Sequence, residues 1–343
     1  MAVVYVKEQG AIIRKHFGRI LVEKDQELLL EIPLRQTDSV AVFGNVQVTT
    51  QALSELLERG IPLALYTRHG RLKGHLVPDI SKNVPLRVAQ YRTALDEAAA
   101  LRIAKAVVRA KLLNSGMLLS DYRRHYPSER LASSCDAMHE AAEKLAGVTQ
   151  HSELLGHEGS AAAAYFSAFT EMNRSELPFD GRRKHPAMDP INGLLSLGYT
   201  LVMNEIRALV EGAGMEPHLG FLHKVDYGRP SLALDLLEPF RAPLVDRLSL
   251  RLVNEKMLTA ADFAKRVGGG AVGSAAGSVI LLPDSFRKYL EAYEAAVTEP
   301  RERAPSGMRQ AWRADVEKLA AAIRDGAAFA PYCEEEDALS GVV

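Results

Sequence analysis

The sequence is poor in cysteine. Its 343 residues include only two, Cys135 and Cys333, which are far apart in the chain. Such a pair excludes a disulfide framework and a zinc site built from cysteine alone. No apolar run approaches the roughly 18 residues needed to cross a bilayer. Because the first residues also lack the pattern of an export signal, we expect a soluble protein of the cytoplasm without membrane contact.

An excess of positive charge is also absent. The chain has 42 basic and 43 acidic residues, and its net charge is −1. Domains that bind nucleic acid are usually strongly basic, so any contact with DNA must come from local patches. We find neither a P-loop nor a convincing dinucleotide fingerprint, and therefore expect no nucleotide cofactor.

The first 80 or so residues alternate short β-branched runs with turn residues, which is typical of strands. We expect strands at 3–6, 11–13, 19–22, 28–32, 39–44, 61–66 and 72–76. One helix should follow Thr49, which would cap it, and should stop at Gly60. Residues 1–82 are therefore predicted to form a small, sandwich-like β-sheet domain with one helix and a linker.

The pattern changes at Pro85, after which apolar residues recur at steps of three and four, as in amphipathic helices. Residues 86–113 should form one long helix. The segments 175–190 and 268–277, rich in glycine or in proline and polar residues, should be irregular. We predict an α+β protein in which residues 83–331 form a larger all-α domain and residues 332–343 a flexible acidic tail.

Two positions that could serve catalysis are ambiguous when taken singly. Glu158 follows Gly156-His157 where we expect a helix to begin, and a first-turn glutamate is commonly explained by the helix dipole alone. His223 stands in an apolar string after Gly220. A lone histidine in such a setting is more often a core residue than a ligand.

A third place holds two carboxylates, Asp235 and Glu238, in a leucine-rich segment that Ser231 should cap as a short helix. Burying them unpaired would be costly, and a cation nearby would remove that cost. Their spacing fits an ion pair with an arginine (Arg229, Arg241 or Arg247) as well as it fits a metal ion. Together with Glu158 and His223, however, they make a carboxylate and imidazole set suited to Mg²⁺ or Mn²⁺.

Basic residues form three clusters that could follow a phosphate backbone, although each alone is usually a solvated face. The clusters are Arg102, Lys105 and Arg109 (with Lys111 beyond), then Arg182, Arg183 and Lys184, then Arg241 and Arg247. Lys224 adds a charge beside His223. Tyr165 could stack on a base, but packing in the core is the commoner fate of a tyrosine.

Taken together, these segments resemble the CRISPR-associated Cas-one (Cas1) family of integrases and endonucleases, which acts in spacer acquisition. The resemblance covers nearly the whole chain. The strings that carry it are Leu155-Gly-His-Glu-Gly, Phe179-Asp-Gly-Arg-Arg, Asp189-Pro-Ile-Asn-Gly-Leu-Leu-Ser-Leu-Gly-Tyr, His218-Leu-Gly-Phe-Leu-His and Gly228-Arg-Pro-Ser-Leu-Ala-Leu-Asp-Leu-Leu-Glu-Pro-Phe-Arg. His157 and Ser115 depart from the family pattern, in which an apolar residue and a glutamine are more usual.

The resemblance implies that Glu158, His223 and Glu238 hold the catalytic Mg²⁺ or Mn²⁺, with Asp235 as the acidic residue beside them. It implies that the 3′-hydroxyl of a short foreign duplex attacks a phosphodiester at the border of a CRISPR repeat. The implied partners are double-stranded DNA (prespacer and repeat), a second copy of the chain paired through the N-terminal domain, and a small Cas-two protein bridging two dimers. Whether an end-trimming Cas-four type nuclease joins them is left open.

Two other functions fit the same residues. The chain could be a non-catalytic subunit that binds DNA as a scaffold, its carboxylates pairing only with arginines. It could also be an unrelated helical metallohydrolase of small phosphate esters, which would leave the basic clusters without a purpose.

Overall fold

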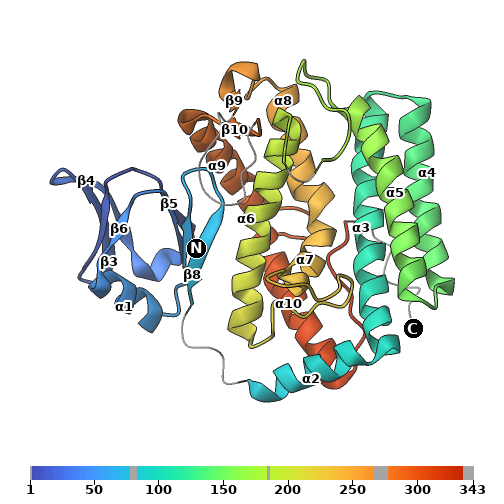
Figure 1. The fold of residues 1–343 in the computed structure, drawn as a ribbon, viewed down its shortest axis with the longest axis horizontal. Helices are drawn as coiled ribbons and strands as arrows, with labels where there is room; N and C mark the ends of the chain where they lie inside the picture. Colours follow the sequence, from blue (N-terminus) through green and yellow to red (C-terminus); the bar gives the residue numbers. More distant parts are fainter. Residues whose placement is uncertain (1, 78–82, 184–185, 266–276, 335–343) are drawn as a thin grey trace. The chain divides into compact units, whose positions relative to one another are not determined.

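The computed structural model describes residues 2–77, 83–183, 186–265 and 277–334 (Figure 1). Contacts along the chain divide it into two compact units, residues 1–82 and 83–343. Within the described ranges, no helix combines the length and the apolar character needed to cross a membrane.

The N-terminal unit contains two four-stranded sheets. The first has the order β1-β5-β7-β8, in which only β8 runs antiparallel to its neighbour. The second has the order β4-β3-β2-β6, with the antiparallel pair β2–β3 in a register that places Ile13 opposite Val22. The strands are β1 (Ala2–Val6), β2 (Ile12–His16), β3 (Arg19–Lys24), β4 (Glu27–Pro33), β5 (Thr37–Phe43), β6 (Gln47–Val48), β7 (Leu63–Tyr66) and β8 (Leu72–Leu76).

One apolar core joins both sheets to the helix α1 (Thr50–Glu58). Ile13 of β2 is fully buried in it, and in β3 the alternate residues Ile20 and Val22 are buried, as the period of two in a strand requires. Thr49 caps α1 by accepting a hydrogen bond from the backbone N–H of Ala52. The predicted β-rich start with one helix is thus confirmed, and the pattern missed only β6, which is two residues long.

The second unit is mainly helical, as predicted, with one small two-stranded ribbon of β9 (Phe263–Lys265) and β10 (Val279–Leu281). In Figure 1, α3, α4 and α5 pack as neighbours. The α-helices are α2 (Val84–Leu95), α3 (Glu97–His125), α4 (Glu129–Lys144), α5 (His151–Met172), α6 (Pro190–Ala213), α7 (Ser231–Leu237), α8 (Arg247–Asn254), α9 (Pro283–Thr298) and α10 (Met308–Asp325). Between α7 and α8 lie a 3₁₀ turn, η3 (Glu238–Phe240), and a π-helical turn, η4 (Arg241–Asp246).

The long helix expected over residues 86–113 is instead two helices. Asp96 adopts an extended backbone, and its side chain accepts a hydrogen bond from the N–H of Ala99, so it ends α2 and caps α3. A short polar residue that competes for backbone donors is a common cause of such a break.

Three smaller expectations were also wrong. Glu158 lies two turns inside α5, not at its start. Ser231 does not cap α7, because its hydroxyl donates to the carbonyl of Lys224. Tyr332 and Cys333, assigned to a flexible tail, are buried, whereas residues 335–343 of that tail lie outside the described residues. The glycine-rich segment predicted to be irregular also lies mostly outside them.

Candidate active site

Side chains from three parts of the helical unit meet around one ammonium group. Helix α3 contributes Lys111, α5 contributes Glu158, and the turn after α7 contributes Glu238. Lys111 Nζ forms an ion pair with Glu158 Oε1 and lies 2.8 Å from Glu238 Oε2. Residues widely separated in sequence are brought together because α3 packs against both α5 and η3.

Glu238 is the most enclosed member of this cluster, with a side chain that is only 2% exposed. Its Oε1 atom lies 2.7 Å from Arg241 Nη2, so the arginine ion pair that the sequence left open is present. Burial alone would raise the pKa of Glu238, but the positive charges of Arg241 and Lys111 and the nearby His223 lower that pKa to about 2. The carboxylate is therefore ionised at any physiological pH.

His223 is held in one orientation by Asp235. The imidazole Nδ1 lies 2.7 Å from Asp235 Oδ1, and the backbone N–H groups of Phe221, Leu222 and His223 also donate to this carboxylate. Because a carboxylate can only accept, Nδ1 donates in this hydrogen bond, and Nε2 is the ring nitrogen that Asp235 leaves free for another contact. Nε2 lies 3.8 Å from Glu238 Oε1, so the histidine points its free nitrogen at the carboxylate cluster.

Gly220 makes this seating of Asp235 possible. A Cβ atom at position 220 would lie 2.6 Å from Asp235 Oδ2 and 2.9 Å from the carbonyl carbon of Ser231. Both distances are shorter than real Cβ atoms show, so only glycine lets the segment before His223 approach α7 this closely.

Among the described residues, no group of three or more His, Cys, Asp or Glu side chains is arranged to hold a metal ion as it stands. The predicted ligands do gather, but around an ammonium group. The donor set nevertheless fits Mg²⁺ or Mn²⁺, since two carboxylates and one imidazole are suitable ligands for these ions. Glu238 Oε2 is buried, accepts no hydrogen bond and meets only the charge of Lys111. A carboxylate behind the histidine, as Asp235 is here, is the usual second partner of a metal-binding imidazole.

Asn114 is a residue that supports the site and that the sequence reasoning missed. Its amide donates to the carbonyl of Pro239 at 2.7 Å and to that of Tyr332 at 3.1 Å, and its oxygen accepts from the backbone N–H of Glu334. Asn114 is fully buried one turn after Lys111 and therefore fixes the turn that carries Glu238. Its departure from an apolar helix pattern was the available signal.

Tyr165 belongs to a buried network and is not free to stack on a base, which corrects that prediction. It is 4% exposed, and its hydroxyl donates to Asp246 Oδ2 at 2.7 Å. The hydroxyl of Tyr199 donates to the other oxygen of the same carboxylate. Burial raises the pKa of Asp246 to about 6, although these two hydrogen bonds and the charges of Arg241 and Arg182 oppose the rise.

Several of the predicted DNA-binding cations are engaged inside the protein. Lys105 donates to the carbonyls of Ala146 and Val148. Arg182 donates to Asn192 and Ser196, and Arg247 pairs with Asp121 at 2.6 Å. Arg241 pairs with Glu238, as described above. Carboxylates neutralise the charges of Arg241 and Arg247, and neutral oxygens hold the donors of Lys105 and Arg182, which makes all four weaker candidates than the sequence suggested.

Three of the other predicted cations are exposed on the surface. Arg102, Arg183 and Lys224 are exposed, whereas Arg109 is partly buried. No side-chain hydrogen bond or ion pair of these four is found within the part of the chain that the structure describes. Lys184 lies outside the described residues.

A groove leads to the histidine of the cluster. It is lined by the end of α2, the first turns of α3, the start of α5 and residues 219–225. Its lining includes Arg102, Lys105, Lys224 and His223, together with Glu97. The groove therefore offers three cationic side chains and includes the histidine of the cluster.

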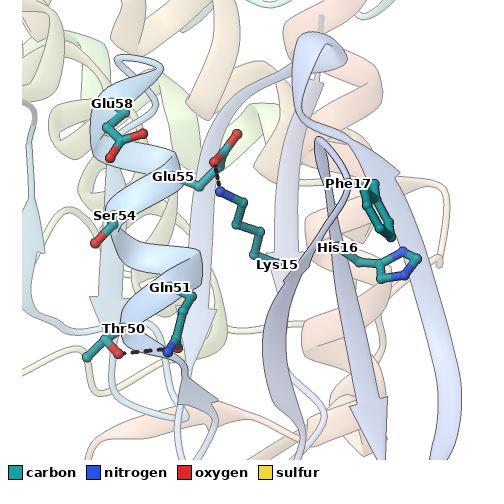
Figure 2. A pocket seen from close by; sticks show the side chains of 8 residues that line it. All are labelled: Lys15, His16, Phe17, Thr50, Gln51, Ser54, Glu55 and Glu58. Carbon is teal, nitrogen blue, oxygen red and sulfur yellow. Dashed lines mark hydrogen bonds and ion pairs between the residues drawn. The ribbon is translucent and has the colours of Figure 1, made fainter.

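A second hollow lies in the N-terminal unit, between the end of β2 and the exposed face of α1 (Figure 2). It contains Lys15 and Glu55, which pair with each other, and Arg59 Nε also binds Glu55 at 2.6 Å. Since these charges already neutralise one another, we assign no chemistry to this hollow.

Comparison with known proteins agrees with the resemblance. The family model of the CRISPR associated protein Cas1 matches residues 4–295. The chain belongs to the Cas1 family. A protein of Rhodospirillum rubrum described as CRISPR-associated endonuclease Cas1 2 is 36% identical over 323 residues, which cover 89% of this chain and 90% of that protein. A Thermus thermophilus protein, CRISPR-associated endonuclease Cas1 3, is 34% identical over 91% of this chain and 90% of its own length.

Solved structures share the Cas1 fold with this chain. A casposase bound to integration product superimposes with a TM-score of 0.80 at 22% identity, covering 99% of this chain and 94% of that one. A complex described as Cas6-RT-Cas1–Cas2 contains a chain with a TM-score of 0.79 at 23% identity, covering 98% of this chain and 36% of that one. At these identities the similarity establishes the fold alone, in which a β-sheet unit is followed by a helical unit.

Proposed function

We propose that this Cas1 family member is a divalent-metal-dependent DNA endonuclease and integrase that inserts short duplexes at a CRISPR repeat. The observation that carries the proposal is the convergence of Glu158, Glu238 and His223, with Asp235 turning the free imidazole nitrogen toward the carboxylates. Two similarities support it: the relatives are named endonucleases, and one structural neighbour is a casposase bound to integration product.

In this mechanism the chain supplies a fixed ligand set and a track for DNA. Glu158, Glu238 and His223 would hold Mg²⁺ or Mn²⁺, and a bound ion stabilises charge on the attacking and leaving oxygens of a phosphodiester. Asp235 keeps the proton of His223 on Nδ1, and Arg241 holds Glu238 in place. The low pKa of Glu238 keeps the carboxylate charged without a further base.

The groove beside His223 is our proposed path for the DNA strand that carries the 3′-hydroxyl. Arg102 and Lys224 border it and have charge to offer a phosphate backbone. Water in place of the hydroxyl would give hydrolysis at the same site. Exchange of one phosphodiester for another is nearly isoenergetic, so the proposal needs no nucleotide cofactor.

The proposed assembly contains two copies of the chain paired through their N-terminal units and a small Cas-two (Cas2) protein bridging two such dimers. The structural neighbour described as a Cas1–Cas2 complex supports a Cas2 partner. An end-trimming Cas-four type nuclease is a further candidate partner, and we place the assembly in the cytoplasm. Several subunits would together offer more positive charge to one duplex than a single chain with a net charge of −1.

The variant Glu238→Ala tests the proposal. We expect strand joining of a labelled duplex to a repeat-bearing plasmid, with Mn²⁺, to fall by more than the roughly 10–100-fold that loss of an outer-shell partner costs. The matched control is Glu255→Ala, which removes an exposed carboxylate paired with Arg251 and should keep the wild-type rate. EDTA should abolish joining by the wild-type protein.

The same assay separates the alternatives. If folded Glu238→Ala joins strands at the wild-type rate, the carboxylates only pair with Arg241 and Lys111, and the catalytic assignment is wrong. If the wild-type protein binds duplex DNA but joins no strands, the protein is a DNA-binding scaffold. If a small phosphate ester is hydrolysed and duplexes with free 3′ ends do not compete, the protein is a different metallohydrolase.

A further inference from the structure

Lys111 occupies the centre of the candidate metal site. Its ammonium contacts Glu158 Oε1 and lies 2.8 Å from Glu238 Oε2, and these are one oxygen from each of the two carboxylates proposed as metal ligands. The lysine side chain is 13% exposed, so most of the charge pairing takes place away from bulk water. The basic cluster on α3 that the sequence suggested as a DNA track does not account for this position.

Electrostatics explains why a cation is needed there before any metal arrives. Glu158 and Glu238 come from different elements, and the Glu238 side chain is 2% exposed. Two carboxylates that share such an enclosed place repel each other, and each is costly to bury unpaired. The backbone fixed by Asn114 keeps the Glu238 turn near α3, so the carboxylate cannot withdraw freely. A single ammonium between them relieves both costs.

A divalent ion bound by the same two oxygens would have to enter the space that the ammonium fills. Two cations cannot both stand at bonding distance from the same oxygen pair without strong mutual repulsion. Lysine has a flexible stem of four carbons, and the contacts of this side chain with Glu158 and Glu238 are made by its ammonium group, so it can withdraw while its helix stays in place.

We propose that Lys111 is a resident counter-ion of the metal site, which a divalent ion displaces on binding. It is a positioning residue: it keeps Glu158 and Glu238 directed at one point when metal is absent, and it weakens metal binding by competing for their charge. The inference rests on the proposed function, because it requires that these carboxylates bind a divalent ion.

Titration of the metal-free full-length protein with Mn²⁺, followed by calorimetry, tests the inference with the variant Lys111→Gln. Without the competing charge, the variant should bind Mn²⁺ at least about tenfold more tightly than the wild type, because a competing interaction lowers apparent affinity by its own free energy. Metal-free Lys111→Gln should also melt at a lower temperature, and saturating Mn²⁺ should raise its Tm by more than that of the wild type.

Lys318→Gln is the matched control. Lys318 Nζ pairs with the buried Asp315 at 3.2 Å, so its loss also removes a cation from beside a buried carboxylate. We expect Lys318→Gln to have a lower Tm than the wild type. Its affinity for Mn²⁺ and the rise in its Tm on adding Mn²⁺ should equal those of the wild type. Lys111→Arg, which retains the charge, should keep the weak binding of the wild type.

The outcomes are distinct. If the wild type binds Mn²⁺ and Lys111→Gln binds it equally or more weakly, the counter-ion role is overturned, but the proposed metal site stands. Absence of Mn²⁺ binding by both proteins overturns the proposed metal site and this inference with it. If Lys111→Gln does not fold without metal, recovery of folded protein in Mn²⁺ but not in EDTA supports the inference, and failure in both overturns it.

Discussion

Asp246 shows how one buried carboxyl makes the stability of the fold depend on pH. Its pKa is raised by burial from its ordinary value of 3.8 to about 6. A carboxyl whose pKa is higher in the folded state contributes stability below pH 3.8, and that contribution is lost as pH rises through 6. The loss is roughly 3 kcal/mol for a shift of this size.

The variant Asp246→Asn should remove this dependence. We expect the free energy of unfolding of the wild type to include a fall between about pH 4 and 7 that is absent in the variant. The variant also changes the hydrogen bonds from Tyr165 and Tyr199, so the quantity to compare is the slope with pH, measured by denaturant unfolding. Burial also raises the pKa of Asp315 to about 6. Asp315 should therefore contribute the same slope of stability against pH in the wild type and in the variant. An unchanged slope in Asp246→Asn would contradict the assignment.

At the scale of elements, the segment from α6 to α7 depends on one glycine. Gly220→Ala would force a Cβ to within 2.6 Å of Asp235 Oδ2, and the segment that carries His223 would have to move. We expect a loss of about 1–3 kcal/mol of stability, as for other overpacked sites. Strand joining should also fall, since His223 would lose its orientation. Thermal unfolding and the joining assay measure the two effects.

Gly212→Ala in α6 is the control for this prediction, because a Cβ there meets nothing within 4 Å. In an exposed part of a helix, alanine in place of glycine should be neutral or stabilising by roughly 0.5–1 kcal/mol. If Gly220→Ala behaves like Gly212→Ala, the close approach to Asp235 is not required.

How far the sequence predicted these elements depended on the range of the interactions. Alternating and helical periodicities are local, so they located the strands of the first unit and the helical character of the second. The motif strings located Glu158, His223 and Glu238, which meet as a cluster. The central place of Lys111 was not predictable, because the partners Glu158 and Glu238 are 47 and 127 residues away in the chain and spacing along α3 cannot reveal them.

The stretch after α7 shows a second limit to prediction from the sequence. Pro239 and Pro243 lack backbone N–H groups, and the chain passes through η3 and η4 before it resumes a regular helix. π-helical turns such as η4 occur often at functional sites, and the tighter 3₁₀ turn η3 separates Glu238 from its partner Arg241. Counting helical periods assumes a constant number of residues per turn, so it could not place these side chains.

For the whole molecule, the proposed function predicts how the binding of DNA should depend on salt. Because Arg241 and Arg247 pair with carboxylates of the same chain, few of the cations proposed for DNA contact are left to meet phosphate, and the dependence of affinity on salt should be modest. The double variant Arg102→Gln/Lys224→Gln should lower the slope of log affinity against log salt by roughly 0.7–0.9 for each lost phosphate contact. Fluorescence anisotropy with a labelled duplex at several salt concentrations measures this slope.

Lys144→Gln provides the comparison. Lys144 is exposed on α4, pairs with Glu140 and does not border the groove. Its loss should leave the salt slope unchanged. If Lys144→Gln lowers the salt slope as much as Arg102→Gln/Lys224→Gln does, the groove is not the path of the DNA.

The hydrogen bonds of Asn114 have a practical consequence for handling the chain. The segment from Tyr332 to Glu334 is fastened to the same amide that holds Pro239, and the ring of Tyr332 stacks on Phe240 at 5.1 Å. Shortening the polypeptide before Tyr332 would therefore unseat the turn that presents Glu238, more than ninety positions upstream. A purification tag or fluorescent fusion must therefore leave residues 332–334 in place.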